Sequence, residues 1–223
     1  MDLAVSARLP KKPKLKASPL DRYDPENKRA EIETRLAHFK SVPKSKWNRE
    51  VLFCLFTPQS NPFNAEASLV KLEQGGLFEG ELTERQVAKI LRTPSHYVRF
   101  HNVKAKRVIA FLGLLPDVTK LLHASLSPFE EREELIRMIN GFGYKEASHA
   151  LRNIGRSGLT ILDRHILRCL QELGVLKAIP RTLTNSNYKT IEQQFLEFAD
   201  SVGEAVDFLD LLFWSNGTGK IFK

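Results

Sequence analysis

Two residues of this 223-residue sequence, Lys145 and Asp163, have types and surroundings that favour chemistry. Lys145 falls in the first turn of an expected helix, where the helix dipole disfavours a cation and so favours the neutral, nucleophilic amine. Asp163 precedes a second run of helical spacing, where a carboxylate can serve as the N-cap. A returning helix that brings them together would pair a nucleophile with a carboxylate, although N-capping alone also explains Asp163.

The segment around Lys145 must position it, and residues 127–155 are expected to form a helix, a two-glycine hairpin and a second helix. Ser127 starts the first helix with a capping box. Gly141 can supply the left-handed residue that stops this helix, and Gly143 leaves the backbone of the next turn uncovered. The N–H groups that follow can bind an anion, but an ordinary connection between two helices also fits. No strand pattern precedes the glycines, which argues against a dinucleotide fold or a Walker loop.

Composition indicates a globular protein with an anionic partner. Hydrophobic residues make up 42%, the formal charge is +8 and the pI is about 9.5, which favours nucleic acid or simply a basic protein. Cys54 and Cys169 are too few for a cysteine-ligated iron–sulfur cluster, and no zinc spacing is present. No long apolar run or signal core occurs, so we expect an intracellular protein without a membrane segment.

The pattern along the chain is helical throughout, with no convincing strand, and predicts an all-α fold. Residues 1–26 are rich in lysine and proline and are interpreted as a basic N-terminal arm, either a disordered tail or a source of phosphate contacts. Residues 215–223 are expected to form a turn after the last helix. The helices between are expected at about 27–42, 47–56, 63–74, 84–92, 103–114, 117–124, 128–140, 144–154 and 164–173, with two more before the end.

Three stretches resemble a known family. Residues 139–165, INGFGYKEASHALRNIGRSGLTILDRH, look like the helix-hairpin-helix motif and following aspartate of the DNA glycosylase superfamily. Within it, GFGYKEASHALRNIG most resembles the compact 8-oxoguanine DNA glycosylase/AP lyase family (type 2) of archaea and some bacteria. Residues 99–106, RFHNVKAK, and the end of the chain from Trp214 to Lys223 are also similar to that family.

The resemblance implies a two-lobed helix-hairpin-helix DNA glycosylase architecture. Residues 51–144 would form a helical barrel lobe that ends in the hairpin. Residues 27–50 and 145–223 would fold together as a discontinuous second lobe. The active cleft would lie between the lobes, with Lys145 and Asp163 at its mouth.

The resemblance also implies bifunctional chemistry on duplex DNA that contains oxidised guanine. Lys145 would attack C1′ of the damaged nucleotide, Asp163 would stabilise the sugar cation, and β-elimination would cut the strand. N–H groups of Gly141 and Gly143 would hold a backbone phosphate. No metal or other cofactor is expected, apart from a monovalent cation at the hairpin. Arg152 and Arg156 would add charge there or be solvated.

Base recognition is assigned by the same resemblance. Trp214 would stack on the flipped base, with Phe100 on the opposite face. Lys223 would contact N7–H of the oxidised base through its side chain or its carboxylate. Gln59 would insert into the DNA stack, although Pro58-Gln59 departs from the usual loop of this family.

The alternatives are a glycosylase/lyase for another damaged base and a non-catalytic module that binds the DNA backbone. The Lys145 and Asp163 pair counts against the second, since a backbone clamp needs neither residue. The histidines have no metal spacing and are assigned no chemistry. A pocket for one flipped base needs no second subunit, so we expect a monomer.

Overall fold

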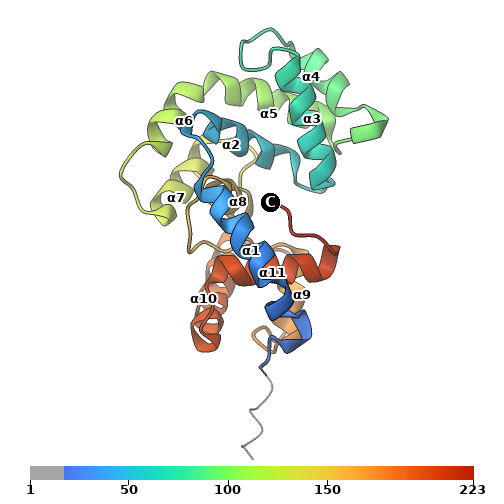
Figure 1. Cartoon of the computed structure of the whole chain (residues 1–223). Helices are drawn as coiled ribbons and strands as arrows, with labels where there is room; N and C mark the ends of the chain where they lie inside the picture. The colour runs from blue at the N-terminus through green and yellow to red at the C-terminus, as the bar shows by residue number, and fades with distance from the viewer. Residues whose placement is uncertain (1–17) are drawn as a thin grey trace, which may run out of the picture.

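The structure, a computed structural model, describes residues 18–223, which form eleven α-helices, three short 3-10 helices and no strand (Figure 1). The all-α prediction is confirmed. The helices are α1 (Pro25–Lys40), α2 (Trp47–Phe56), α3 (Pro62–Gln74), α4 (Glu84–Leu91), α5 (His101–Gly113), α6 (Leu115–Leu122), α7 (Pro128–Met138), α8 (Tyr144–Asn153), α9 (Arg164–Glu172), α10 (Asn185–Val202) and α11 (Val206–Thr218).

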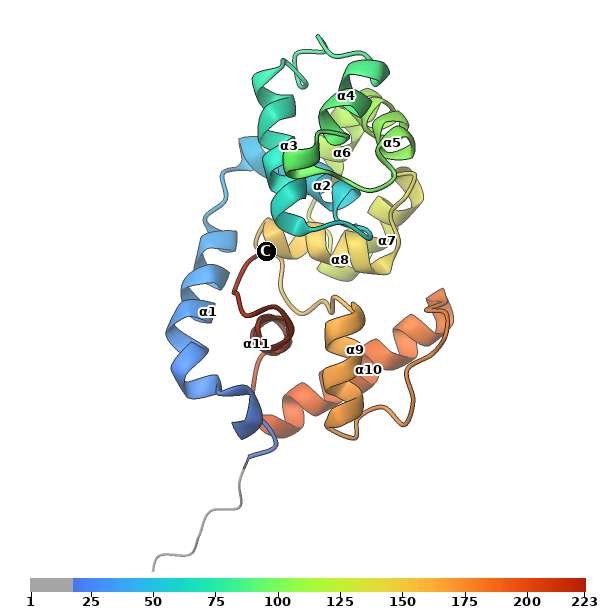
Figure 2. The same ribbon diagram turned by 90° about the vertical axis from the view of Figure 1, so that its right-hand side faces the viewer.

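Helix α2 is the centre of the first hydrophobic core. Eight of its ten residues are buried, so it must be surrounded by other helices. Helices α3, α5, α6 and α8 pack directly against it. The core that they enclose runs from Trp47 to Leu159, and we call α2–α7 the barrel lobe (Figure 2).

A second hydrophobic core joins the two ends of the described chain. It runs from Leu20 to Ile221, and helices α1, α9, α10 and α11 contribute to it. Helix α1 packs along α11 although the whole barrel lobe separates them in sequence, as Figures 1 and 2 both show. We call these four helices the second lobe.

Helix α8 belongs to both cores. Its inner residues Ala147, Ala150 and Leu151 are fully buried in the first core, whereas Tyr144 at its start is buried in the second. Because α8 is wedged between the lobes, a residue in its first turn lies at their junction. The proposed lobe boundaries, 27–50 with 145–223 and 51–144, stay a prediction.

The basic arm expected over residues 1–26 falls mostly outside the described residues. The segment from Ser18 to the start of α1 packs into the second lobe, since Leu20 is 3% and Tyr23 is 1% exposed in its core. The ring of Tyr23 lies 4.8 Å from that of Phe213 on α11.

Capping decides where the helices begin. The capping boxes at Ser127 and Thr83 both form, as predicted. The turn predicted for residues 215–223 is wrong in its first part, because α11 continues to Thr218 and ends at Gly219 with φ of 73°. The packing of α11 favours glycine at position 217. Any side chain there would collide with the ring of His165, whose Nδ1 lies 2.2 Å from an ideal Cβ.

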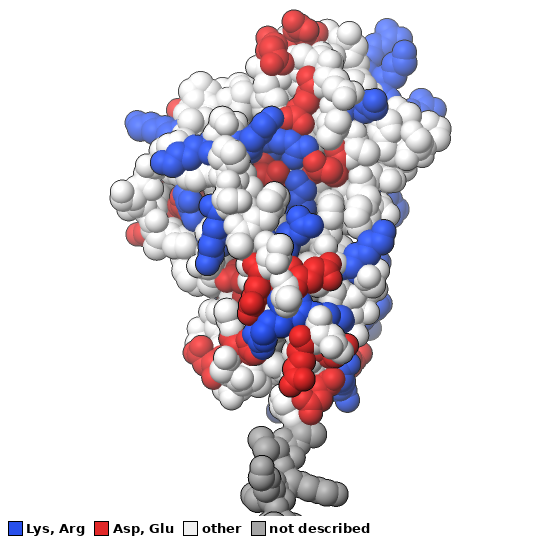
Figure 3. Space-filling model, viewed as in Figure 1, with Lys and Arg blue, Asp and Glu red and all other residues white. Residues whose placement is uncertain are grey.

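The surface seen in Figure 3 carries acidic and basic side chains of both lobes, intermingled across the face. Charged side chains of the described residues also form ion pairs, such as Arg29 with Glu204 and Lys46 with Glu73. None of the helices within residues 18–223 is long and apolar enough to span a bilayer.

Candidate active site

A cavity of about 720 Å³ lies between the two lobes. Its walls come from the loop between α2 and α3, from α8, from the start of α9 and from α11. Five of the residues predicted for the site line this cavity: Gln59, Lys145, Asp163, Trp214 and Lys223.

Lys145 stands in the first turn of α8, as expected. Its side chain is 27% exposed, and its amine lies 3.1 Å from Oε1 of Glu146. The neighbouring carboxylate offsets the unfavourable interaction of the ammonium with the helix dipole. The amine of Lys145 is therefore bound by Glu146 but remains accessible to a ligand in the cavity.

Asp163 is the N-cap of α9, as its position in the sequence predicted. Its Oδ1 accepts hydrogen bonds from the N–H groups of His165 at 2.7 Å and Ile166 at 3.0 Å. Both bonds go to the same oxygen, and they fix the orientation of the carboxylate. Within residues 18–223 the other oxygen, Oδ2, has no hydrogen-bond donor, so it remains available to a ligand.

The hairpin between α7 and α8 needs a glycine at its first position. Gly141 has φ of +98°, and an ideal Cβ there would lie 2.6 Å from the guanidinium carbon of Arg107 on α5. Arg107 has no carboxylate partner among the described residues. Gly143 is extended instead, and its N–H donates to Oε2 of Glu146 at 3.2 Å. A phosphate at Gly143 would have to replace this contact.

The loop that carries Gln59 is held by a buried lysine. Gln59 is exposed and has φ of 53°, an unusual conformation for a residue other than glycine. The amine of Lys104 donates to the carbonyls of Phe56 at 2.7 Å and Pro58 at 2.8 Å, and to the hydroxyl of Ser60 at 3.0 Å. Burial lowers the pKa of Lys104 to about 7, with smaller effects from nearby cations.

The aromatic residues predicted for base recognition lie in different places. Trp214 lines the cavity, whereas Phe100 does not and is 48% exposed beside the guanidinium of Arg99. Phe63, which the sequence did not single out, lines the cavity and lies 4.4 Å from the ring of Phe222.

Arg152 and Arg156 are not solvated, because each forms an ion pair within the protein. Arg152 forms a buried ion pair with Asp210 of α11, and both residues line the cavity. Burial raises the pKa of the Asp210 carboxyl, an effect that Arg152 opposes. Arg156 makes two hydrogen bonds of 2.7 Å to Glu131. Ion pairs hold both guanidinium groups in place, and their contribution of charge to a bound phosphate stays a prediction.

His149 and Asp210 are cavity residues that sequence reasoning missed. His149 is 8% exposed, and burial lowers the pKa of its ring well below the ordinary value, so the imidazole is neutral. Asp210 had a usable signal, because Asp207 and Asp210 interrupt an otherwise apolar helix at one helical spacing. Within residues 18–223 no three His, Cys, Asp or Glu side chains are grouped as metal ligands; the monovalent cation at the hairpin stays a prediction.

A lysine and a carboxylate on α8 and α9, in an interlobe cavity beside a two-glycine hairpin, suit an enzyme that draws one nucleotide out of a duplex. Together with the two helical lobes, they define the helix-hairpin-helix DNA glycosylase class.

Comparison with known proteins narrows the class. Residues 32–204 match the family model described as 8-oxoguanine DNA glycosylase, so the chain belongs to this family. The 8-oxoguanine DNA glycosylase/AP lyase of Fusobacterium nucleatum is 36% identical over 199 residues, which cover 85% of this chain and 89% of the relative. The enzyme of the same name from Methanocaldococcus jannaschii is 33% identical over 196 residues, or 86% and 91% of the two chains.

Solved structures agree. The 8-oxoguanine glycosylase/lyase of M. jannaschii in complex with a 15mer DNA containing 8-oxoguanine has a TM-score of 0.81 and 27% identity, and the match covers 92% of this chain and 98% of that one. The 8-oxoguanine DNA glycosylase of Thermotoga maritima has a TM-score of 0.80 and 28% identity, with the same coverage. The predicted family and the two-lobed fold are thereby confirmed.

Proposed function

We propose that this protein removes 8-oxoguanine from duplex DNA and then cuts the strand at the abasic site. One observation carries the proposal: in a chain of this family, Lys145 and Asp163 line the same interlobe cavity. The function would place the protein with the genome, in the cytoplasm or nucleoid, and one subunit holds all the groups that the reaction requires.

The damaged nucleotide must leave the base stack before its C1′ can be reached, which costs a few kcal/mol. The N–H groups of the hairpin at Gly141 and Gly143 would hold a phosphate beside it, with Arg107 supplying positive charge. Gln59, at the tip of its loop, would fill the space that the base leaves.

Lys145 acts as a neutral amine, after its proton is lost and the ion pair with Glu146 breaks. Its nitrogen forms a bond to C1′ while the bond from C1′ to N9 of the base breaks. The base leaves with that electron pair and takes up a proton. Asp163 stabilises the positive sugar and accepts the proton that the attacking amine loses.

Strand cleavage follows from the covalent intermediate. Opening of the sugar ring leaves a Schiff base between Lys145 and C1′. Loss of a proton from C2′ then expels the 3′-phosphate, and water hydrolyses the Schiff base to free Lys145. A lysine nucleophile makes this second step available, whereas a water nucleophile would stop at base release.

The base would be recognised by stacking and by one polar contact. Trp214 would provide a stacking face inside the cavity. Phe100 remains the proposed partner on the other side, which requires the DNA or its loop to bring the exposed ring and the base together. The amine of Lys223 is bound by carboxylates, so contact with N7–H falls to the backbone end of this residue.

Borohydride trapping tests the proposal. A duplex with one 8-oxoguanine opposite cytosine is mixed with the protein and sodium borohydride, and we expect a covalent adduct that Lys145→Gln abolishes without loss of DNA binding. Lys71→Gln, which changes an exposed lysine on α3, is the control and should trap like the wild type.

The other outcomes distinguish the alternatives. An adduct with an abasic duplex but not with 8-oxoguanine would keep the lyase and indicate a different damaged base. Binding without any adduct would indicate a non-catalytic backbone-binding module or a glycosylase that uses water.

A further inference from the structure

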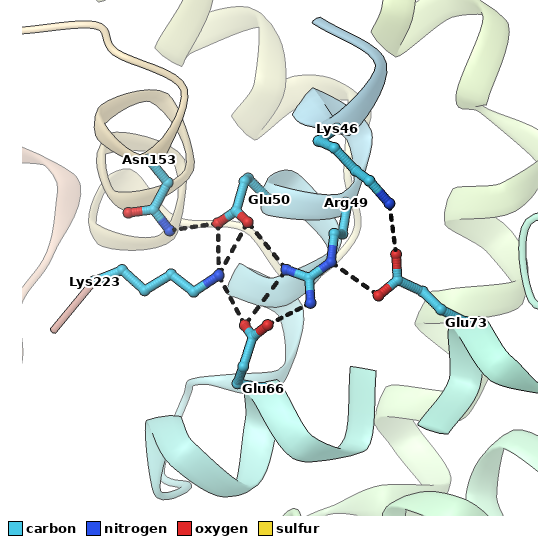
Figure 4. A network of polar contacts seen from close by, with 7 residues as sticks. All are labelled: Lys46, Arg49, Glu50, Glu66, Glu73, Asn153 and Lys223. Atoms are coloured by element: carbon cyan, nitrogen blue, oxygen red, sulfur yellow. Dashed lines mark hydrogen bonds and ion pairs between the residues drawn. The ribbon is translucent and has the colours of Figure 1, made fainter. Parts of the chain in front are cut away.

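The side chain of Lys223 points into a socket of carboxylates (Figure 4). Its amine lies 3.0 and 3.1 Å from the two oxygens of Glu50 and 2.7 Å from Oε2 of Glu66. It also lies 4.5 Å above the centre of the Phe53 ring. The side chain is only 13% exposed.

The socket is formed by residues of three helices, which also contact one another. Glu50 comes from α2 and is 7% exposed, and Asn153 of α8 donates to it at 3.2 Å. Glu66 comes from α3. Arg49 lies between the acidic groups and bonds to Glu50 at 3.1 Å, as well as to Glu66. The socket is therefore part of the barrel lobe and α8.

The Glu66 carboxyl of the socket favours its charged form when the protein is folded. Burial of Glu66 opposes ionisation, but hydrogen bonds and charge from Arg49 and Lys223 together lower the pKa of this carboxyl below its usual value. Arg49 neutralises only part of the acidic charge, because Glu50, Glu66 and Glu73 all surround it. Lys46 pairs with Glu73 at the edge of the network, so Glu50 and Glu66 need one further cation besides Arg49, and Lys223 provides it.

Other contacts anchor the residues that precede Lys223. Gly219 is in the left-handed region, and the exposed Lys220 lies over the ring of Phe63 at 4.6 Å. The ring of Phe222 packs against the same ring, tilted by 38°, with the two centroids 4.4 Å apart. Ile221 is 9% exposed in the core of the second lobe and anchors the chain two residues before its end. The ion pairs in the socket are the contacts of the Lys223 side chain itself, so they hold the last residue in place against the cavity.

We infer that Glu50 and Glu66 are positioning residues for base recognition: by binding the amine of Lys223, they hold its backbone against the flipped base. The inference rests on the proposed function. Under this inference, discrimination between oxidised and normal guanine depends on the carboxylates of Glu50 and Glu66, although neither contacts the base.

The test compares two substrates, because only one of them has a base to recognise. Base excision is measured on a duplex containing 8-oxoguanine, with alkali used to reveal every excised site, and strand cutting is measured on a preformed abasic duplex. For Glu66→Gln and Lys223→Met we expect kcat/KM for excision to fall by about 100-fold, as for other displacements of about 1 Å near a reacting group. Cutting of the abasic duplex should be unchanged, because Lys145 and Asp163 lie outside the socket.

Two further variants separate positioning from general stability. Lys46→Met removes a lysine at the edge of the same network, which is 58% exposed and pairs with Glu73 at 3.5 Å, and it should behave as wild type. Lys223→Arg keeps a cation for the socket and should restore much of the excision lost in Lys223→Met. If Lys223→Met fails to fold, Glu66→Gln provides the test instead, because glutamine has the size of glutamate and removes only the charge of this side chain.

Equal losses on the 8-oxoguanine and abasic duplexes would overturn the inference, since the socket would then act only on stability. Wild-type excision by Lys223→Met would overturn it as well. Failure of the proposed function looks different: the wild type itself would not excise 8-oxoguanine.

Discussion

Asp163 has two roles that one substitution can separate. Its Oδ1 caps α9, whereas the proposed mechanism also requires its charge. Asparagine caps a helix about as well as aspartate. We therefore expect Asp163→Asn to keep the thermal unfolding midpoint while kcat on 8-oxoguanine DNA falls by about 10²–10⁴-fold.

Asp163→Ala should lose the same activity and, in addition, about 1 kcal/mol of stability, because the cap is removed. The matched control is Thr184→Ala, which removes the cap of α10 outside the cavity and should lower stability without changing kcat. An active Asp163→Asn enzyme would limit this residue to capping.

Lys104 should make stability depend on pH. Its pKa is lowered to about 7 in the folded protein from an ordinary 10.5, so between these values the unfolded chain binds more protons. Stability therefore rises with pH across this window. In urea unfolding we expect the wild type to gain stability relative to Lys104→Met from pH 7 to pH 10.

At pH 7 and below, Lys104→Met leaves the carbonyls of Phe56 and Pro58 without this donor, which costs about 1–3 kcal/mol per unpaired group. A difference between the two proteins that stays constant with pH would mean that the three acceptors keep the amine protonated.

The hairpin shows how an element depends on one backbone conformation. Gly141→Ala must accept a φ of +98° and also displace the guanidinium of Arg107. Gly158→Ala must accept a φ of +84° but would meet no atom within 4 Å. Strain alone costs about 1–3 kcal/mol at either position.

We expect the two alanine variants to lose similar stability, while only Gly141→Ala weakens DNA binding, because Arg107 moves away from the hairpin. Calorimetry and a fluorescence binding titration measure the two effects. Equal affinities for the two variants would remove Arg107 from the DNA-binding surface.

Helix positions were largely predictable because local signals set them. The capping boxes at Thr83 and Ser127 start α4 and α7 where the sequence indicated. The error at α11 arose because Gly217 has no local reason to be helical. Its place is set by the ring of His165, which reaches it only after α9 and α11 pack together.

At the scale of the whole molecule, the basic N-terminal arm adds to the positive charge of the chain. Residues 1–17 include Arg8, Lys11, Lys12, Lys14 and Lys16. Each phosphate that they neutralise should add about 0.9 to the slope of log affinity against log salt. Removal of residues 1–17 should therefore weaken DNA binding at low salt and lower this slope, with kcat unchanged. An unchanged slope would mean that the arm makes no phosphate contact.

The site was predictable where chemistry needs a particular residue type, as for Lys145 and Asp163. It was not predictable where two distant helices create the environment. Arg152 and Asp210 are an ion pair only because α8 and α11 meet across the cavity. The socket of Lys223 likewise depends on the packing of the separate helices α2 and α3, so no residue spacing in the sequence predicts it.

The shared helix α8 has a consequence for synthesis. The core of the barrel lobe is contiguous from Trp47 to Leu159, whereas α1 must find partners on α9–α11. Chains emerge from the ribosome N-terminus first and domains generally fold as units, so the barrel lobe can form while α1 still lacks its neighbours. The hairpin and Lys145 are then in place before Asp163 and the opposite cavity wall. A nascent chain can therefore hold DNA before it can cut it.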